Sequence, residues 1–276
     1  MKLGIGWLVP VILGLWLPLS KHAVAEVDES AVLTFGVVPQ QASEKLARDW
    51  VPLMKLLSDT VGRPIRFATA PDIPEFERRL SIGAYDVAYM NPYHFITIGE
   101  GAGYQALVRQ KNHKLRGIIV VSRDLRFESV DELAGESIAF PAPMAFAATL
   151  VTRSHLNTHA PGYRPTYVNS HDSVYRGVAD GLFAAGGGIV RTLREVAPDI
   201  QEKLEVLWLS PGYTSHAIAT HPRVSEELRG RLANAFLMLS DDELGRKLLQ
   251  ALGMSGFQSA ANSDWDDVRQ LDFSTR

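Results

Sequence analysis

Residues 83–95 read Gly-Ala-Tyr-Asp-Val-Ala-Tyr-Met-Asn-Pro-Tyr-His-Phe, and this stretch decides the fold. Residues 86–90 are nearly all apolar or aromatic, which is typical of a parallel strand that is buried on both faces. Asn91 and Pro92 end the strand, and proline is favoured in the first turn of a helix. We therefore expect Tyr93 and His94 to lie at the carboxyl edge of a sheet, where ligands bind and helix N–H groups favour anions.

The segments before this stretch alternate between strand and helix patterns. Residues 33–38 and 64–70 are predicted strands, whereas residues 43–61 and 74–82 carry apolar side chains at helical spacing. Together with residues 86–90 they predict a βαβαβ unit with a parallel sheet. A second unit of the same kind follows, with predicted strands at 137–140, 165–168 and 184–190 and helices over 145–156 and from residue 173.

The chain passes between these two units twice, near residues 109–122 and again near 206–220. We expect a two-lobed α/β protein, in which each lobe is a mostly parallel sheet flanked by helices. Lobe 1 is predicted to comprise residues 26–115 and 216–276, and lobe 2 residues 116–215. Two lobes joined by two crossing segments place a ligand cleft at the hinge.

The first residues have the features of a secretory signal peptide. Lys2 supplies the positive charge, residues 4–19 are largely apolar, and Ala23-Val24-Ala25 is a small-x-small cleavage site. We expect residues 1–25 to be removed and the mature chain to begin at Glu26 in the periplasm. The alternative is an uncleaved N-terminal anchor.

The composition excludes several classes of site and partner. The chain has no cysteine, which excludes disulfides, cysteine zinc sites, thiol nucleophiles and a cysteine-linked lipid anchor. Its net charge is −3, which argues against nucleic acid as a partner. An anionic small ligand stays open, because fixed dipoles in a site override the net charge.

Several of these segments carry a family resemblance. Phe35-Gly36-Val37-Val38-Pro39-Gln40, Trp50-x-Pro52-Leu53, residues 83–92 and Ser170-His171-Asp172-Ser173-Val174 together resemble the phosphonate-binding protein family. Its members are substrate-binding proteins of phosphate, phosphite and phosphonate ABC transporters. The resemblance implies a type II periplasmic-binding fold, with ligand contacts from residues 91–94, from residues 141–149 and from His171.

The chain departs from the family pattern at the start of the helix in lobe 2. The resemblance implies a cluster of serine and threonine hydroxyls there, which would surround a tetrahedral oxyanion. Residues 141–149 read Pro-Ala-Pro-Met-Ala-Phe-Ala-Ala-Thr, so that only Thr149 carries a hydroxyl. We therefore expect weak binding of phosphate and methylphosphonate, and better binding of an anion with a partly apolar body.

The strand ends and the family resemblance together select the candidate ligand-binding residues. These are Gln40, Asn91, Tyr93, His94, Met144, Phe146, Thr149, His171 and Tyr213. Each also has a plainer interpretation. Tyr93 and His94 could be surface turn residues, Gln40 could belong to a helix entry, and His171 could cap a helix. Large apolar side chains such as Phe146 are more often buried packing.

We expect a monomeric periplasmic solute-binding protein that needs no cofactor and closes on a small anionic ligand. Its partner would be an ABC permease or, alternatively, a membrane sensor kinase. A second hypothesis is that His94, His171 and His216 hold a transition metal. An enzyme on the same fold is disfavoured, because the sequence supplies no nucleophile–base pair.

Overall fold

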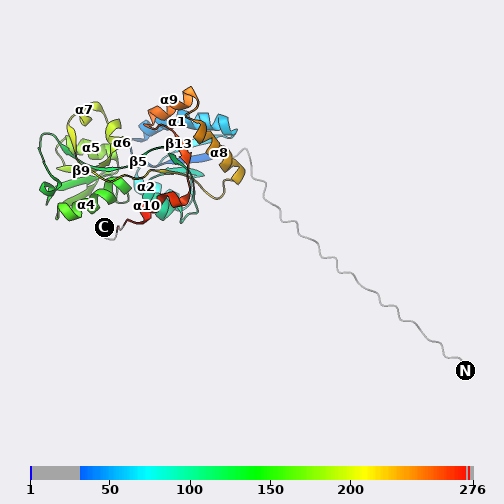
Figure 1. Cartoon of the computed structure of the whole chain (residues 1–276), viewed down its shortest axis with the longest axis horizontal. Coiled ribbons are helices and arrows are strands. Elements are labelled where there is room, and N and C mark those ends of the chain that lie inside the picture. The colour runs from blue at the N-terminus through cyan, green and yellow to red at the C-terminus, as the bar shows by residue number, and fades with distance from the viewer. Residues whose placement is uncertain (2–31, 272, 274–276) are drawn as a thin grey trace.

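The structure, a computed structural model, describes residues 1, 32–271 and 273. Residues 2–25 of the predicted signal peptide, with the predicted cleavage site, lie outside the described residues. The described chain forms two lobes, one coloured blue, cyan, orange and red, the other green to yellow (Figure 1). Within residues 32–271, no helix combines the length and the apolar character needed to cross a membrane.

A six-stranded sheet forms the first lobe. In sheet order its strands are β13 (Phe257–Ser259), β4 (Gln105–Gln110), β12 (Ala217–Thr220), β3 (Val87–Met90), β1 (Leu33–Val37) and β2 (Ile65–Ala68). Strand β1 pairs in parallel with β2 and with β3, which confirms the predicted βαβαβ unit. The other three pairs are antiparallel, so the sheet is mixed rather than mostly parallel. The antiparallel pairs arise because the chain returns to this lobe from the other one.

Four longer helices cover the first lobe: α1 (Ser43–Val61), α2 (Ile73–Ser81), α8 (Glu226–Met238) and α9 (Glu243–Ala251). Helix α1 buries the apolar face that its sequence predicts, and the ring of Trp50 lies 5.7 Å from that of Phe35 on β1. The helix ends at Gly62, whose φ of 65° is the left-handed conformation that glycine adopts without strain.

A five-stranded sheet forms the second lobe. In sheet order its strands are β10 (Leu204–Leu209), β6 (Gly117–Ser122), β9 (Ala185–Ile189), β7 (Ser137–Phe140) and β8 (Arg164–Tyr167). Strand β7 pairs in parallel with both β8 and β9, as the second βαβαβ unit requires. Strands β6 and β10, which enter and leave this lobe, add antiparallel pairs, so this sheet is mixed as well.

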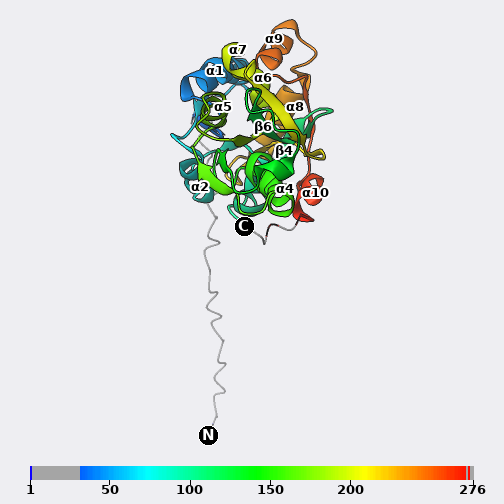
Figure 2. The ribbon, with the colours of Figure 1, turned by 90° about the vertical axis from the view of Figure 1, so that its left-hand side faces the viewer.

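Helices cover both faces of the second sheet. Alternate residues of β6 point to opposite faces, as in any strand. Ile118 and Val120 pack with α5 (His171–Ala179), whereas Ile119 and Val121 pack with Leu156 of α4 (Thr152–His159). Figure 2 looks onto this lobe, with α5 and α4 on either side of β6. Shorter helices complete it: η2 (Val130–Leu133), α6 (Val190–Glu195) and α7 (Pro198–Gln201).

A two-stranded ribbon joins the lobes, and we call it the hinge ribbon. Strand β5 (Lys114–Leu115) pairs antiparallel with β11 (Tyr213–Thr214), and Figure 1 labels β5 between the lobes. The C-terminal helices η4 (Asn262–Trp265) and α10 (Asp266–Arg269) lie against it. One oxygen of Asp267 accepts hydrogen bonds from the Thr214 backbone N–H at 2.8 Å and from its hydroxyl at 3.0 Å.

Each lobe turns from strand to helix through a wide helical turn. Strand β3 is followed by α3 (Pro92–His94) and the π-helix η1 (Phe95–Gly99), and β7 is followed by the π-helix η3 (Phe146–Val151). The sequence predicted an α-helix over 145–156, so its first part differs from the expectation. Such π turns often occur at functional sites.

Candidate ligand-binding site

A small cavity lies between the lobes, and we call it the inter-lobe cavity. Its polar lining comes from Gln40, Asn91, His171 and His216, and its apolar lining includes residues 145–148. The cavity volume is about 10 Å³, which is about the space that one water molecule needs. A larger ligand would therefore require the lobes to part.

Two glycines position the η3 turn that forms one wall of this cavity. A Cβ atom at Gly187 on β9 would lie 2.0 Å from the carbonyl oxygen of Ala148, and one at Gly117 on β6 would lie 2.2 Å from that of Ala147. Real Cβ atoms do not approach so closely, so only glycine lets η3 lie directly on the strands. Thr149 follows in this turn, fully buried, and its hydroxyl has no hydrogen-bond partner among the described residues.

Asn91 connects the two lobes directly. Its Oδ1 accepts a hydrogen bond from the backbone N–H of His94 at 2.8 Å, so it caps the helix that follows β3. Its Nδ2 donates to the carbonyl oxygen of Met144 in the second lobe at 3.2 Å. Met144 therefore meets Asn91 through its backbone.

We expect Asn91→Ala to destabilise the fold by about 1–2 kcal/mol, because a helix cap is lost. We also expect it to weaken lobe closure, since an inter-lobe hydrogen bond is worth about 1 kcal/mol. Ser225→Ala is the matched control, because Ser225 caps α8 through its hydroxyl. Denaturant unfolding measures the first effect for both variants. Small-angle scattering should show a larger radius of gyration for Asn91→Ala only, and equal radii would contradict the closure role.

Gln40 and His171 meet across the lobe interface. The backbone N–H of His171 donates to the carbonyl oxygen of Gln40 at 3.1 Å, and His171 Nδ1 lies 3.2 Å from the hydroxyl of Thr192. Burial, with a smaller contribution from the charge of Arg191, lowers the pKa of His171 to about 3. The imidazole is therefore neutral at pH 7. His171 is not the cap of α5, because the hydroxyl of Ser170 has that role.

Tyr93, His94 and Tyr213 lie behind the cavity wall. Tyr93 packs edge-on against Phe273 at 5.2 Å, and Tyr213 packs edge-on against Phe146 at 5.4 Å. His94 is fully buried, with Nε2 at 2.9 Å from Oε1 of Glu77 on α2. The interpretation of Tyr93 and His94 as surface turn residues is therefore wrong, and both side chains belong to the interior.

His94, His171 and His216 are not arranged as a metal site. His216 lines the inter-lobe cavity and stacks on Tyr89, with ring centroids 4.9 Å apart. No group of three His, Asp or Glu side chains in the described part of the chain is placed to hold a metal ion. The structure thus does not bring His94, His171 and His216 together as ligands.

Sequence reasoning missed Arg191, the second residue of α6. Its side chain is only 13% exposed, and its Nη2 donates to Oε1 of Gln40 at 2.5 Å across the lobe interface. Arg191 is the second residue after the end of β9, so the criterion that selected residues 91–94 would also have selected this position. A single arginine near a helix start is otherwise typical of a solvated surface.

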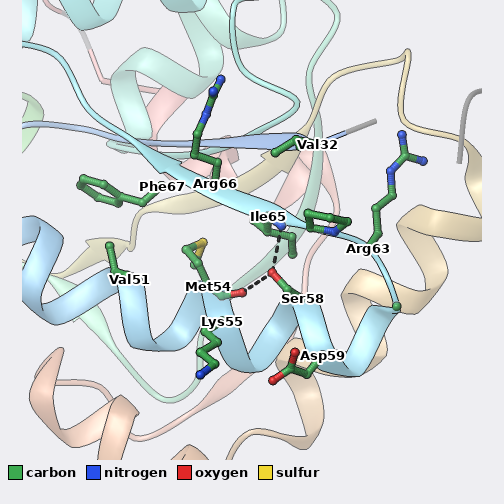
Figure 3. Close-up of a pocket in the computed structure, with 12 residues that line it drawn as sticks. Val32, Val51, Met54, Lys55, Ser58, Asp59, Arg63, Ile65, Arg66 and Phe67 are labelled. Atoms are coloured by element: carbon green, nitrogen blue, oxygen red, sulfur yellow. Dashed lines mark hydrogen bonds between the residues drawn. The ribbon is translucent and has the colours of Figure 1, made fainter. Parts of the chain in front are cut away.

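A larger cavity of about 820 Å³ lies away from the lobe interface, between α1 and β2. Figure 3 shows its walls, with Lys55 and Asp59 on α1 and Arg66 on β2. The Ser58 hydroxyl in this wall is already used, because it donates to the carbonyl of Met54 and accepts from the N–H of Ile65. The predicted ligand-binding residues lie elsewhere, around and behind the inter-lobe cavity.

The comparison with protein families decides what this arrangement is. Residues 35–265 match the family described as the periplasmic substrate-binding protein of phosphonate ABC transporters. The chain belongs to this family. Its members are transport proteins that bind substrates rather than enzymes, and the predicted family resemblance is confirmed.

Relatives and solved structures agree with this assignment. The phosphonates-binding periplasmic protein of Escherichia coli is 20% identical over 275 residues, covering 92% of this chain and 79% of that protein. A phosphonate-transporter binding protein from Pseudomonas aeruginosa is 18% identical with a TM-score of 0.81, covering 87% of this chain and 85% of that one. PhnD1 from Prochlorococcus marinus, in complex with methylphosphonate, is 16% identical with a TM-score of 0.79. The match covers 87% of this chain and 96% of that one. These structures share the two-lobed type II fold.

Proposed function

We propose that the protein captures a small organic anion of the phosphonate class in the inter-lobe cavity and delivers it to an ABC permease. The family supports the ligand class. The observation that carries the proposal is a pair of buried polar atoms without partners. His216 Nε2 and Thr149 Oγ1 make no hydrogen bond within residues 32–271. Buried polar groups are normally paired. His216 lines the inter-lobe cavity and Thr149 directly follows the lining residues 145–148, so both groups would find a partner in a ligand held there.

The proposed ligand contacts come from both lobes. Gln40, Asn91, Thr149, His171 and His216 would hydrogen-bond the anionic group, and Phe146 would pack against its organic part. Met144 meets the cavity residue Asn91 through its backbone carbonyl. Tyr213 packs against Phe146 and the His94 backbone N–H donates to Asn91, so these two residues would hold cavity groups in place. Tyr93 would act less directly, because it reaches Phe146 through Phe273.

Ligand capture would use rotation of the lobes about the hinge ribbon. We propose the lobe boundaries given by residues 26–115 with 216–276, and by residues 116–215. The position of the ribbon supports this division, because it pairs residues 114–115 with residues 213–214. Closure over a ligand is a standard motion of two-lobed binding proteins.

We further propose a permease rather than a sensor kinase as the partner, and a monomer in solution. We also propose export with cleavage after Ala25, for which N-terminal sequencing of the periplasmic protein is the test. No catalysis is proposed, because the cavity lining offers no nucleophile next to a base.

Titration calorimetry with phosphate, methylphosphonate and ethylphosphonate tests the ligand class. We expect ethylphosphonate to bind more tightly than methylphosphonate, by about fourfold, because each buried CH₂ group contributes about 0.8 kcal/mol. Phosphate should bind most weakly, since the wall at residues 145–148 offers backbone and apolar groups but no hydroxyl.

Phe146→Ala should reduce the preference for ethylphosphonate, because Phe146 lines the cavity. Val51→Ala, at an exposed position of α1, is the control and should leave the order unchanged. Binding of phosphate more tightly than ethylphosphonate would contradict the proposal that the apolar wall favours the organic group of the ligand. Failure of all three ligands to bind would overturn the proposed ligand class.

A further inference from the structure

Arg191 brings a positive charge into the lobe interface. Its guanidinium donates to Gln40 of the first lobe and lies 3.4 Å from both carboxylate oxygens of Glu195, one helical turn further along the chain. Glu195 is in turn 3.9 Å from the ammonium group of Lys45. Arg191 therefore makes contacts both along its own helix, with Glu195, and across the interface, with Gln40.

The contact with Arg191 fixes the orientation of the Gln40 side-chain amide. A guanidinium has only N–H donors, so Gln40 must turn its oxygen toward Arg191. Gln40 itself lines the inter-lobe cavity, so Arg191 lies one residue behind the cavity wall. An anionic oxygen of a ligand is a stronger acceptor than an amide oxygen and could replace it on the guanidinium.

No negative charge in the cavity opposes Arg191. The residues that line the cavity, all within the described chain, include no aspartate or glutamate. His171 and His216 supply the titratable groups there, and burial lowers the pKa of both. The charge of Arg191 lowers both pKa values further, which indicates that its field reaches the cavity.

We propose that Arg191 determines which charge the organic group of a bound ligand may carry. The site would accept phosphonates whose organic group is neutral or anionic, and it would reject those that carry an ammonium group. An ammonium held in the cavity would lie near a buried guanidinium, from which only Gln40 separates it, with no carboxylate in the lining to pair with it. This proposal rests on the proposed function and specifies the substrate class of the same site.

A plainer interpretation is that Arg191 and Glu195 form a structural ion pair along α6. Such a pair would stabilise the helix without influencing which ligand binds. The two interpretations differ in what the charge itself does, so variants that keep or remove the charge distinguish them.

The test uses three ligands with a common two-carbon frame: ethylphosphonate, 2-aminoethylphosphonate and phosphonoacetate. Calorimetry of the wild-type protein should show 2-aminoethylphosphonate binding at least tenfold more weakly than each of the other two. Arg191→Lys, which keeps the charge, should retain this order. Arg191→Gln should reduce the difference severalfold, whereas Arg194→Gln, at an exposed position of the same helix, should leave it unchanged.

Two results would overturn the charge rule: wild-type binding of 2-aminoethylphosphonate as tight as that of ethylphosphonate, or the same affinity ratio in Arg191→Gln. A ligand-free measurement keeps the inference separate from the proposed function. In an NMR titration of the histidines, Arg191→Gln should raise the pKa of His171, and an unchanged pKa would also overturn the rule. If none of the three ligands bound the wild type while this pKa rose, the proposed function would fail and the electrostatic role of Arg191 would stand.

Discussion

Substituting Gly187 by valine is expected to destabilise the protein by about 3 kcal/mol or more, and to abolish ligand binding in the molecules that fold. The Cβ alone would lie 2.0 Å from the carbonyl oxygen of Ala148, and it would also meet the ring of Phe140 at 2.6 Å. Neither the backbone of η3 nor a core ring can yield without moving the cavity wall. Overpacking of this kind commonly costs 1–3 kcal/mol when only side chains must shift, and here backbone must shift too.

Gly230→Ala is the matched control for this substitution. Gly230 lies on the exposed side of α8, and a Cβ there would meet nothing within 4 Å. Alanine in a helix interior is favoured over glycine by about 1 kcal/mol, so this variant should be slightly more stable than the wild type. Thermal and denaturant unfolding compare the two. A Gly187→Val protein with wild-type stability would show that η3 does not pack on β9 as described.

Stability is expected to fall as the pH is lowered from 6.5 toward 5. The pKa of His171 is about 3 in the folded protein, because the side chain is buried, whereas an unfolded histidine titrates near 6.5. The unfolded state therefore binds protons first, and the stability that is fully present above pH 6.5 decreases below it. His171 alone accounts for about 2 kcal/mol of loss by pH 5.

Other groups modify this pH dependence in known directions. Burial also lowers the pKa of His216, which adds to the loss in the same window. Burial raises the pKa of Asp172, and an acid of that kind opposes the loss as the pH falls. Urea unfolding at pH 7 and pH 5 measures the net effect, and His171→Gln should make the dependence shallower. A stability that is equal at the two pH values in the wild type would contradict a neutral buried His171.

Local sequence patterns predicted the repeating elements well because those elements are fixed by nearby residues. The spacing of Leu46, Trp50 and Leu57 predicted α1 with its ends, and Gly62 predicted where it stops. The predicted parallel units are present in both lobes. The antiparallel strands were not predicted as such, because their direction depends on where the chain returns rather than on their own residues.

The site was predicted less completely, and the reason is geometric. Position after β3 selected Asn91, Tyr93 and His94 together, yet successive residues of a helix point about 100° apart. Tyr93 consequently points elsewhere and packs on Phe273, whereas Asn91 and His94, three residues apart, lie side by side with Nδ2 3.1 Å from Nε2. Of these two, only Asn91 also reaches the second lobe, while His94 meets Glu77 within its own lobe. The role of Arg191 depends on a partner 151 residues away in the sequence, and no local pattern reports such a contact.

The attachment of the C-terminal helix to the hinge ribbon has a practical consequence for protein engineering. Asp267 holds Thr214 at 2.8 Å, and Trp265 donates to the carbonyl oxygen of Ser215 at 2.8 Å, so residues 265–267 are fastened to the segment that joins the lobes. A fluorescent label attached beside residues 265–267 would therefore lie next to the segment that joins the lobes. If the lobes rotate as proposed, such a label would report the angle between them, which makes this segment an attachment point for a biosensor.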